Sequence, residues 1–266
     1  MDLFLKDKVV VVTGAAGIKG SIGETIVQAL TEEGAIPVIV CRNDRGFQYE
    51  KELQEKGIDA IFVKTDLSDV DQIEKAAKVI EEKYGRVDAL INNVGVNDGA
   101  GLDASIDDFM YSLKLNLVSF YAMTKFCLPM IKKVKGNILN IGSKVALTGQ
   151  GNTSGYAAAK GGVFGLTREW AVDLITDQIR VNAIVIAESW TPAYDNWIQS
   201  VENGEEILRE IKEKIPFENR MTTPREIADQ CLFTISERSS HTTGQFIGVD
   251  GGYVNLDRAL LSEKID

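Results

Sequence analysis

The sequence predicts an α/β fold in which a seven-stranded parallel sheet carries helices on both faces. Short β-branched, apolar runs alternate with helical stretches along almost all of the 266 residues. Such alternation implies parallel strands joined by right-handed crossovers. No long linker, repeat or low-complexity tract interrupts it. We therefore expect residues 1–266 to form one doubly wound, Rossmann-type domain.

Strands are expected where short apolar runs lack a polar face, as in a sheet that is buried on both sides. The first run places four valines between Lys8 and Thr13. The predicted strands cover residues 8–13, 36–41, 58–64, 88–92, 136–142, 179–184 and 245–250.

Helices are expected between these strands, and the first three are followed by a glycine, a residue that commonly ends a helix. Pro129 is expected to bend or shorten the helix over residues 107–133. An excursion at about residues 187–220, helical over 191–214, is expected to form a substrate loop. The first predicted helix ends near residue 33. The others cover residues 44–56, 69–84, 154–176 and 224–236.

Composition argues against several classes of function. The formal net charge of −10 argues against a nucleic-acid or anionic-membrane partner. The three cysteines lie far apart and His241 is the single histidine, so no metal site is predicted. No G-x-S-x-G motif suggests a serine hydrolase. A charged N-terminus and the lack of any run of ~18 apolar residues predict a cytoplasmic protein.

A glycine-rich turn follows the first predicted strand. Glycines stand at positions 14, 17, 20 and 23, directly before a helical stretch. Glycine lets the backbone approach a pyrophosphate, and the N-terminus of the following helix favours its negative charge. In this position a dinucleotide site is a better interpretation than a purely conformational use of glycine.

The end of the second predicted strand indicates which nicotinamide cofactor binds. An NAD site usually has an acidic residue there, whereas an NADP site has a basic group. Here Cys41 is followed by Arg42 and Asn43, and the Arg42 guanidinium is suited to a 2′-phosphate. Lys19, in the glycine turn, offers a second cation. We expect NADP to be preferred and NAD to remain possible, with Asp44 as the alternative ribose contact.

Ser143, Tyr156 and Lys160 carry groups suited to moving a proton at a carbon–oxygen bond. Tyr156 and Lys160 are four residues apart, so on a helix they share one face. A tyrosine with a pKa of about 10 is a poor base near neutral pH, but a nearby cation favours its phenolate. Alone, this Y-x-x-x-K spacing favours an ordinary surface tyrosine and a solvated lysine. The neighbouring motifs reverse that preference.

In order and spacing, these motifs resemble those of the short-chain dehydrogenase/reductase family over the entire chain. The turn from Thr13 to Gly23 is similar to the family's T-G-x-x-x-G-x-G, lengthened by three residues. The other matches are Asn92-Asn93-Val94-Gly95 to N-N-A-G, Asp66 to the adenine contact, Asn116 to the helix asparagine, Ser143 to the strand-five serine, Tyr156 and Lys160 to Y-x-x-x-K, and Val249–Gly252.

The resemblance implies direct hydride transfer between a substrate carbon and the nicotinamide. Tyr156 would be the general acid/base, and Lys160 would lower its pKa and hold the nicotinamide ribose. Ser143 would position the reacting oxygen, and Asn116 would hold a water linking Lys160 to solvent. The cofactor-binding residues implied are Gly14, Gly17, Lys19, Ser21, Ile22, Gly23, Arg42, Asn43, Asp66, Leu67, Asn93, Val94, Gly95, Tyr156, Lys160 and Thr191.

Three departures from the family pattern bear on function. The lengthened glycine turn resembles the enoyl-reductase branch, but that branch would place its lysine at Val163, so this activity is not expected. Val94 replaces an alanine and is expected to tighten the wall beside the cofactor. Ile186 and Ala187 replace the usual Pro-Gly. Thr191 is retained before Pro192, so its nicotinamide contact is expected to survive.

Within the family, the chain most resembles bacterial L-fucose 1-dehydrogenases, which oxidise the anomeric hydroxyl of a pyranose to a lactone. Residues 96–104, 148–156, 166–172, 187–188, 191–198, 240–244 and 256–260 carry this resemblance. Polar side chains on loops at the carboxyl ends of strands suit a polyol. The candidate substrate contacts are Asn97, Ser143, Gln150 and Glu188. For Gln150, as for Asn152, satisfying a turn is the alternative role.

The function predicted is that of an NADP-preferring sugar 1-dehydrogenase acting on L-fucose or a related aldose. A carbonyl reductase of an oxoacyl or keto-sugar substrate is the alternative enzyme. A cofactor-sensing protein without turnover is the second alternative, against which the complete set of four catalytic residues argues. The resemblance implies a homotetramer through the helices over residues 107–133 and 154–176 and the last strand. Leu256, Leu260 and Leu261 are expected to pack on a neighbour.

Overall fold

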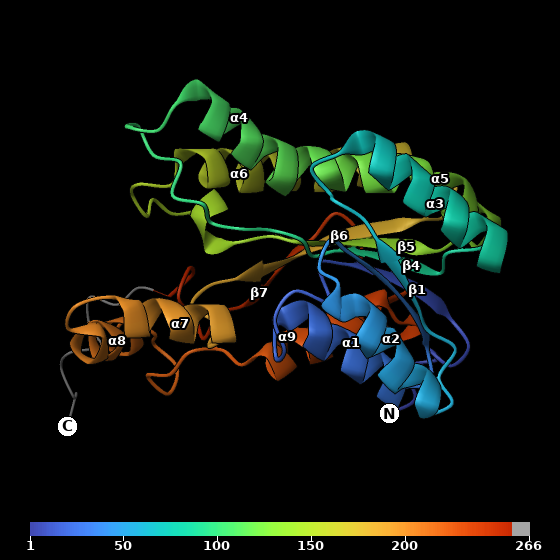
Figure 1. Ribbon diagram of the computed structural model, residues 1–266, viewed down its shortest axis with the longest axis horizontal. Helices are drawn as coiled ribbons and strands as arrows, with labels where there is room; N and C mark the ends of the chain where they lie inside the picture. The colour runs from blue at the N-terminus through green and yellow to red at the C-terminus, as the bar shows by residue number, and fades with distance from the viewer. Residues whose placement is uncertain (257–266) are drawn as a thin grey trace.

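A computed structural model describes residues 1–256, so Leu260 and Leu261 lie outside the described residues. Its centre is a seven-stranded parallel sheet in the order β3-β2-β1-β4-β5-β6-β7 (Figure 1). The predicted α/β fold is thereby confirmed. The strands are β1 (Val9–Thr13), β2 (Ile36–Cys41), β3 (Ile61–Lys64), β4 (Ala89–Asn92), β5 (Asn137–Ile141), β6 (Arg180–Ile186) and β7 (Phe246–Val249).

The strand order reverses between β1 and β4. Val12 of β1 pairs with Ile39 of β2 on one side and with Ile91 of β4 on the other. The turns that follow β1 and β4 therefore leave the sheet side by side, at the same edge. In a doubly wound sheet this switch point is where ligands bind.

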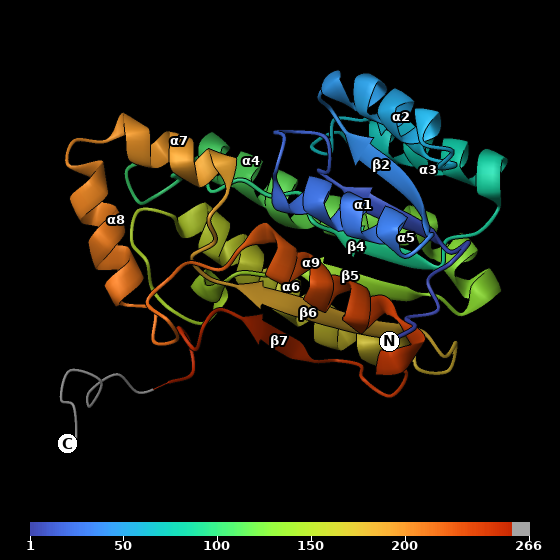
Figure 2. The same ribbon diagram turned by 90° about the horizontal axis from the view of Figure 1, so that it is seen from below.

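Helices cover both faces of the sheet (Figures 1 and 2). Val10 and Val12 of β1 pack into the core beneath α1 and α9, whereas Val9 and Val11 pack toward α3 and α5. This two-sided burial explains why the strand has no polar face. One face carries α1 (Ile22–Glu32), α2 (Arg45–Glu55) and α9 (Pro224–Ile235), and the other carries α3 (Val70–Tyr84), α4 (Ile106–Leu113), α5 (Ser119–Val134) and α6 (Ser154–Asp173).

The helix predicted over residues 107–133 is divided by a π-helical turn rather than shortened by its proline. The turn spans Lys114–Val118 between α4 and α5. Pro129 lies inside α5, which continues to Val134. The expectation that Pro129 shortens the helix is wrong, because the buried Cys127, Met130 and Ile131 hold this segment against the sheet.

Strand boundaries differ from the prediction by more than one residue at two places. β3 starts at Ile61 rather than residue 58 because the residues before it close the end of α2, with Ile58 N donating to Leu53 O over 3.1 Å. β6 extends to Ile186 rather than residue 184 because its last residue pairs with Val249 of β7. The first difference comes from a local helix end, and the second comes from a partner that is distant in sequence.

The helical excursion consists of α7 (Pro192–Ser200) and α8 (Gly204–Glu213), which lie beyond the carboxyl ends of β6 and β7 (Figure 1). It returns to the sheet through a bridge between Ser189 and Thr222. No residue of α8 is fully buried, so this helix rests on the edge of the molecule. Within residues 1–256, no helix has both the length and the apolar character needed to cross a bilayer.

Candidate active site

A cavity of about 810 Å³ opens at the carboxyl ends of the strands, over the switch point. It brings together every expected cofactor-binding residue except Lys19, whose side chain is exposed outside the lining. The lining segments follow β1, β2, β3, β4, β5 and β6, so the sheet gathers residues spread over most of the chain. The cavity is the candidate dinucleotide site.

The glycine turn fits closely against the segment after β4. A Cβ at Gly23 would lie 2.6 Å from Asn93 Nδ2, and a Cβ at Gly14 would lie 3.0 Å from Val94 Cα. Gly14 also has a φ of +73°, which side chains rarely adopt. A Cβ at Gly17 would meet nothing within 4 Å, so this backbone is open to the cavity. The turn thus has the close packing and exposed backbone that a pyrophosphate requires.

Glu24 and Arg45 hold the lengthened part of this turn. The Glu24 side chain is 3% exposed, and its carboxylate accepts hydrogen bonds from Gly20 N and from Arg45 Nη2. Tyr49 Oη donates to Glu24 O over 3.4 Å, and the Arg45 guanidinium lies 5.5 Å from the centre of the Tyr49 ring. Sequence reasoning missed this pair, because an acidic residue in the first turn of a helix is ordinary.

Arg42 and Asp66 lie at the end of the cavity near β2 and β3. Arg42 is exposed and lines the cavity. Hydrogen bonds from Ser68 lower the pKa of Asp66, and the nearby Arg42 acts in the same direction. Asp44, the alternative ribose contact, pairs with Lys64 Nζ over 2.5 Å. At this end of the cavity the Arg42 guanidinium is therefore available to a 2′-phosphate, whereas the Asp44 carboxylate already pairs with Lys64.

Tyr156 and Lys160 project from the first turns of α6 toward the end of β5. Lys160 is 2% exposed, and its Nζ donates to Ile141 O over 2.7 Å. The same Nζ lies 5.6 Å from the centre of the Tyr156 ring. Ser143 hydrogen-bonds the Tyr156 hydroxyl. The structure thus brings together the serine, tyrosine and lysine that the motifs of the sequence predicted.

Burial shifts the pKa values of both catalytic side chains toward their neutral forms. It raises the pKa of Tyr156 to about 12, against the opposing effect of the Ser143 hydrogen bond, and lowers the pKa of Lys160 to about 7. Lys160 was expected to hold the Tyr156 pKa down. Burial dominates the pKa of Tyr156, so the lowering by Lys160 remains a prediction.

Asn116 lies in the π-helical turn and is fully buried. Its Oδ1 accepts from Val96 N over 2.8 Å, and its Nδ2 donates to Val96 O over 3.1 Å and to Ser112 O over 3.0 Å. The side chain therefore fixes the loop after β4, beside Gly95 and Lys160. The role of Asn116 in holding a water remains a prediction.

The expected substrate contacts lie at the same edge of the sheet but outside the lining of the main cavity. Asn97 Oδ1 accepts from the hydroxyl of Thr153, which ties the loop after β4 to the start of α6. Gln150 is exposed. Glu188 pairs with Lys144 and also accepts a hydrogen bond from Tyr194. Sequence reasoning missed Lys144, because a lysine after a strand carries no distinctive signal.

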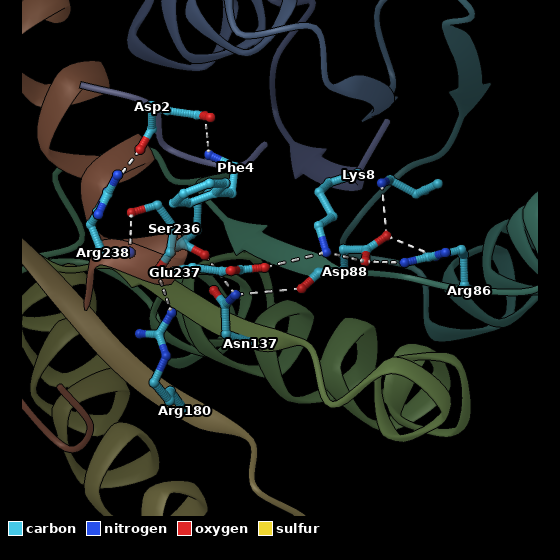
Figure 3. Close-up of polar contacts among 12 residues, drawn as sticks. Asp2, Phe4, Lys8, Arg86, Asp88, Asn137, Arg180, Ser236, Glu237 and Arg238 are labelled. Carbon is cyan, nitrogen blue, oxygen red and sulfur yellow. Dashed lines mark hydrogen bonds and ion pairs between the residues drawn. The ribbon is translucent and has the colours of Figure 1, made fainter. Parts of the chain in front are cut away.

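A second cavity, of about 270 Å³, lies at the opposite edge of the sheet. The charged side chains around it pair with one another: Lys8 Nζ is 3.8 Å from both Asp88 Oδ1 and Glu237 Oε1, and Arg86 Nε donates to Asp88 over 2.9 Å (Figure 3). Arg180 donates to Ser236 O over 3.2 Å. These contacts tie the amino ends of the strands together. Within residues 1–256, no group of three or more His, Cys, Asp or Glu could hold a metal ion.

Comparisons with known proteins agree with this site. A family model described as enoyl-(acyl carrier protein) reductase matches residues 14–254. The 3-oxoacyl-[acyl-carrier-protein] reductase FabG of Thermotoga maritima is 34% identical over 256 residues, covering 94% of this chain and 99% of that protein. The L-fucose dehydrogenase of Bos taurus is 34% identical over 249 residues, covering 92% of this chain and 88% of that protein.

Two solved structures share the fold over nearly their whole length. The Cj0485 dehydrogenase superimposes with a TM-score of 0.92 at 46% identity, covering 98% of this chain and 99% of that one. The Thermoplasma acidophilum aldohexose dehydrogenase superimposes with a TM-score of 0.84 at 28% identity, covering 95% and 96%. The order of motifs, the geometry of the cavity and these matches agree: the chain belongs to the short-chain dehydrogenase/reductase family, whose members are NAD(P)-dependent oxidoreductases.

Proposed function

We propose that this oxidoreductase is an NADP-preferring sugar 1-dehydrogenase, which oxidises the anomeric hydroxyl of L-fucose or a related aldose to the lactone. The observation that carries the proposal is the meeting of Ser143, Tyr156 and Lys160 at one end of a cavity lined by dinucleotide-binding residues. The similarity to a protein named L-fucose dehydrogenase supports the choice of substrate, as does the fold shared with an aldohexose dehydrogenase.

The chain's own side chains account for the proton that leaves the sugar. The Ser143 hydroxyl would hold the anomeric oxygen, and Tyr156 would take the proton of the anomeric hydroxyl as the C1–O bond becomes a carbonyl. A bound oxidised nicotinamide supplies the acceptor for the C1 hydride and a positive charge that favours the phenolate. Lys160, which donates to Ile141 O, holds its Nζ 5.6 Å from the centre of the Tyr156 ring, where a positive charge would favour the phenolate.

The preference for NADP rests on the end of the cavity near β2. Arg42 is an exposed cation of the lining, and Asp44 is engaged by Lys64. A carboxylate free to accept from a ribose 2′-hydroxyl would favour NAD, whereas a guanidinium favours a 2′-phosphate. Lys19 lies outside the lining, so we assign the preference to Arg42 alone.

A carbonyl reductase of an oxoacyl or keto-sugar substrate is the second candidate. The similarity to a 3-oxoacyl-[acyl-carrier-protein] reductase over nearly the whole of both chains favours it. The same serine, tyrosine and lysine would serve that reaction in the opposite direction, with Tyr156 giving its proton to the carbonyl oxygen. Substrate choice therefore depends on the loops around the site rather than on the catalytic residues.

Initial rates on a substrate panel test the proposal. The panel contains L-fucose, aldoses that differ from it at a single carbon, an acetoacetyl thioester and a simple diketone, each with NADP(H) and NAD(H). We expect oxidation of L-fucose or a close relative, faster with NADP at limiting cofactor. A Tyr156→Phe variant serves as the control for non-enzymatic oxidation. Turnover of the keto substrates without turnover of any aldose would exclude the sugar function.

We infer that the protein is a homotetramer. Exposed apolar side chains on α4, α5 and α6 support this proposal: Ile106, Met110, Tyr111, Tyr121 and Val172. Light scattering with size-exclusion chromatography is expected to give four times the mass of 29.2 kDa. A mass of one chain would contradict the proposal. We also propose a cytoplasmic setting, which the three buried and free cysteines support.

A further inference from the structure

Lys144 and Glu188 form an ion pair beside Ser143 that has no role in the chemistry described above. Lys144 follows Ser143 directly and is 8% exposed, which is low for a lysine. Its ammonium group contacts Glu188 Oε1, and the Tyr194 hydroxyl donates to Glu188 Oε2 over 3.0 Å. Three segments therefore meet at one carboxylate: the turn after β5, the end of β6 and helix α7.

A buried ion pair contributes little net stability to a fold. Removing two charges from water costs free energy, and their attraction offsets that cost only when the geometry is good. Apolar side chains of equal volume often stabilise the fold as well or better. The pair is nevertheless largely closed to solvent, with side-chain exposures of 10% and 15%. Lys144 Nζ also lies 4.4 Å from the centre of the Tyr253 ring. These directional contacts suit a role in holding neighbouring groups in place.

The turn that Lys144 anchors is the turn that carries Ser143. Ser143 caps a short 3₁₀ turn, Lys144–Ala146, and its Oγ accepts from Val145 N over 3.4 Å. The carbonyl of Lys144 closes this turn by accepting from Leu147 N over 2.8 Å and from Thr148 N over 2.9 Å. The direction of the Ser143 hydroxyl toward Tyr156 therefore depends on a turn whose outer side is held by the Lys144 side chain.

The same carboxylate holds the start of α7. Tyr194 N donates to the hydroxyl of Thr191 over 3.2 Å, and Thr191 lines the main cavity. Glu188 itself is fixed through its backbone, since its carbonyl accepts from Thr222 N over 3.0 Å. The Tyr194 hydroxyl thus connects α7 to the segment that follows β6, beside the lining residue Thr191.

We propose that Lys144, Glu188 and Tyr194 form a clamp in which Lys144 positions Ser143, Tyr194 positions α7, and Glu188 joins the two. The inference rests on the proposed chemistry at Ser143 and Tyr156 and is independent of which substrate is used. It also revises the expected role of Glu188. Each of its carboxylate oxygens has a protein partner, so we assign it a positioning role instead of a sugar contact.

Steady-state kinetics of three isosteric variants of the full chain test the clamp. We expect Lys144→Met to lower kcat by about tenfold or more with KM for substrate little changed, because a misplaced Ser143 weakens the transition state. Tyr194→Phe is expected to raise KM with kcat nearly unchanged, because it loosens α7 alone. Glu188→Gln should both lower kcat and raise KM. Lys132→Met breaks a more exposed ion pair, with Asp177 (2.7 Å), away from the site, and both parameters should stay at the wild-type values.

A double-mutant cycle with Ser143→Ala separates positioning from a general loss of structure. If Lys144 acts through Ser143, then Lys144→Met lowers kcat in the wild type but has no further effect in the Ser143→Ala background. Thermal unfolding and NADP(H) titration establish that each variant is folded. Should Lys144→Met alone fail to fold, the Lys144→Met/Glu188→Gln double variant leaves no unpaired charge and enters the same cycle.

Additive effects of Lys144→Met and Ser143→Ala, or an unchanged kcat in Lys144→Met, would overturn the clamp. A Glu188→Gln variant whose KM rises for one sugar but not for that sugar's deoxy analogue would identify Glu188 as a direct sugar contact and overturn it as well. The substrate proposal fails differently. A wild-type enzyme that turns over only keto substrates refutes the sugar function, and the clamp is then measured with those substrates.

Discussion

Replacement of Arg45 by methionine probes the contact that holds the lengthened glycine turn. Glu24 is almost completely buried and relies on Arg45 Nη2 and Gly20 N for its hydrogen bonds. Methionine keeps much of the volume beside Tyr49 but removes the charge. Within the described residues Arg45 Nη1 has no hydrogen-bond partner, so the variant removes no further hydrogen bond, although it also removes the guanidinium from the Tyr49 ring. The largest change is that the buried Glu24 carboxylate loses its cation.

The expected loss of stability follows from that burial. Removing one partner of a fully buried pair costs about 3–5 kcal/mol. The Arg45 side chain is 28% exposed, so solvent partly screens the pair and a loss of about 2–3 kcal/mol is expected. With an unfolding entropy of about 2.1 cal/mol/K per residue, the 266 residues give a fall in Tm of roughly 4–5 °C. A Glu24→Gln/Arg45→Met double variant should recover much of the lost stability, because it leaves no unpaired carboxylate.

Calorimetry and cofactor titration check this prediction together. Because the pair holds the pyrophosphate turn rather than the 2′-phosphate end, we expect Arg45→Met to weaken NAD and NADP binding by the same factor. Arg225→Met is the matched control, since Arg225 is half-exposed in its pairs with Glu32 and Asp229 and lies away from the cavity. An Arg45→Met variant as stable as Arg225→Met, or one that loses only NADP affinity, would refute the reasoning.

Three further predictions concern the cofactor and the buried lysine. In a fluorescence titration, Arg42→Gln should raise the Kd for NADP by about 10- to 100-fold, which is the effect of one charge-assisted hydrogen bond, and should leave the Kd for NAD unchanged. An equal loss of affinity for both cofactors would contradict the role of Arg42 at the 2′-phosphate. Gly23→Ala should abolish binding of both cofactors, because its Cβ would lie 2.6 Å from Asn93 Nδ2, and wild-type affinity in a titration would show that the turn moves aside. Burial lowers the pKa of Lys160 from 10.5 to about 7, so between these pH values the unfolded chain binds one more proton than the folded chain, and the stability of the wild type rises with pH. The stability of Lys160→Met relative to the wild type, measured by urea unfolding, should therefore fall from pH 7 to 10. A difference that stays constant with pH would refute this.

The strand pattern shows how far the fold could be predicted from sequence. Each strand of a doubly covered sheet is buried on both faces, so most of its residues are apolar and the strand can be found without knowing its neighbours. The four valines of β1 illustrate this, since alternate side chains enter the two cores. The ends of strands are harder, as β6 shows: its last residues are ordered by pairing with β7.

The candidate site could be predicted where residues act through a local motif. Tyr156 and Lys160 are one helical turn apart, and the glycines of the first turn are close in sequence, so these motifs can be recognised together along the chain. The predicted substrate contacts remain predictions. Asn97 and Glu188 bond to protein groups, and the exposed Gln150 lies outside the lining of the cavity. A polar residue on a loop has no local signal that says whether its partner is a ligand or another side chain.

The sequence by itself determined the order of strands and helices, the cofactor turn and the identity of the proton-transfer groups, because these depend on periodicity and on short spacings. Only the tertiary structure decided which partners the buried charges take. Glu24 meets Arg45 and Glu188 meets Lys144 through the approach of loops at the edge of the sheet, across 21 and 44 residues of chain. The tertiary structure also decided the direction in which the pKa values of Tyr156 and Lys160 shift, because desolvation depends on everything packed around a group and not on its neighbours in sequence.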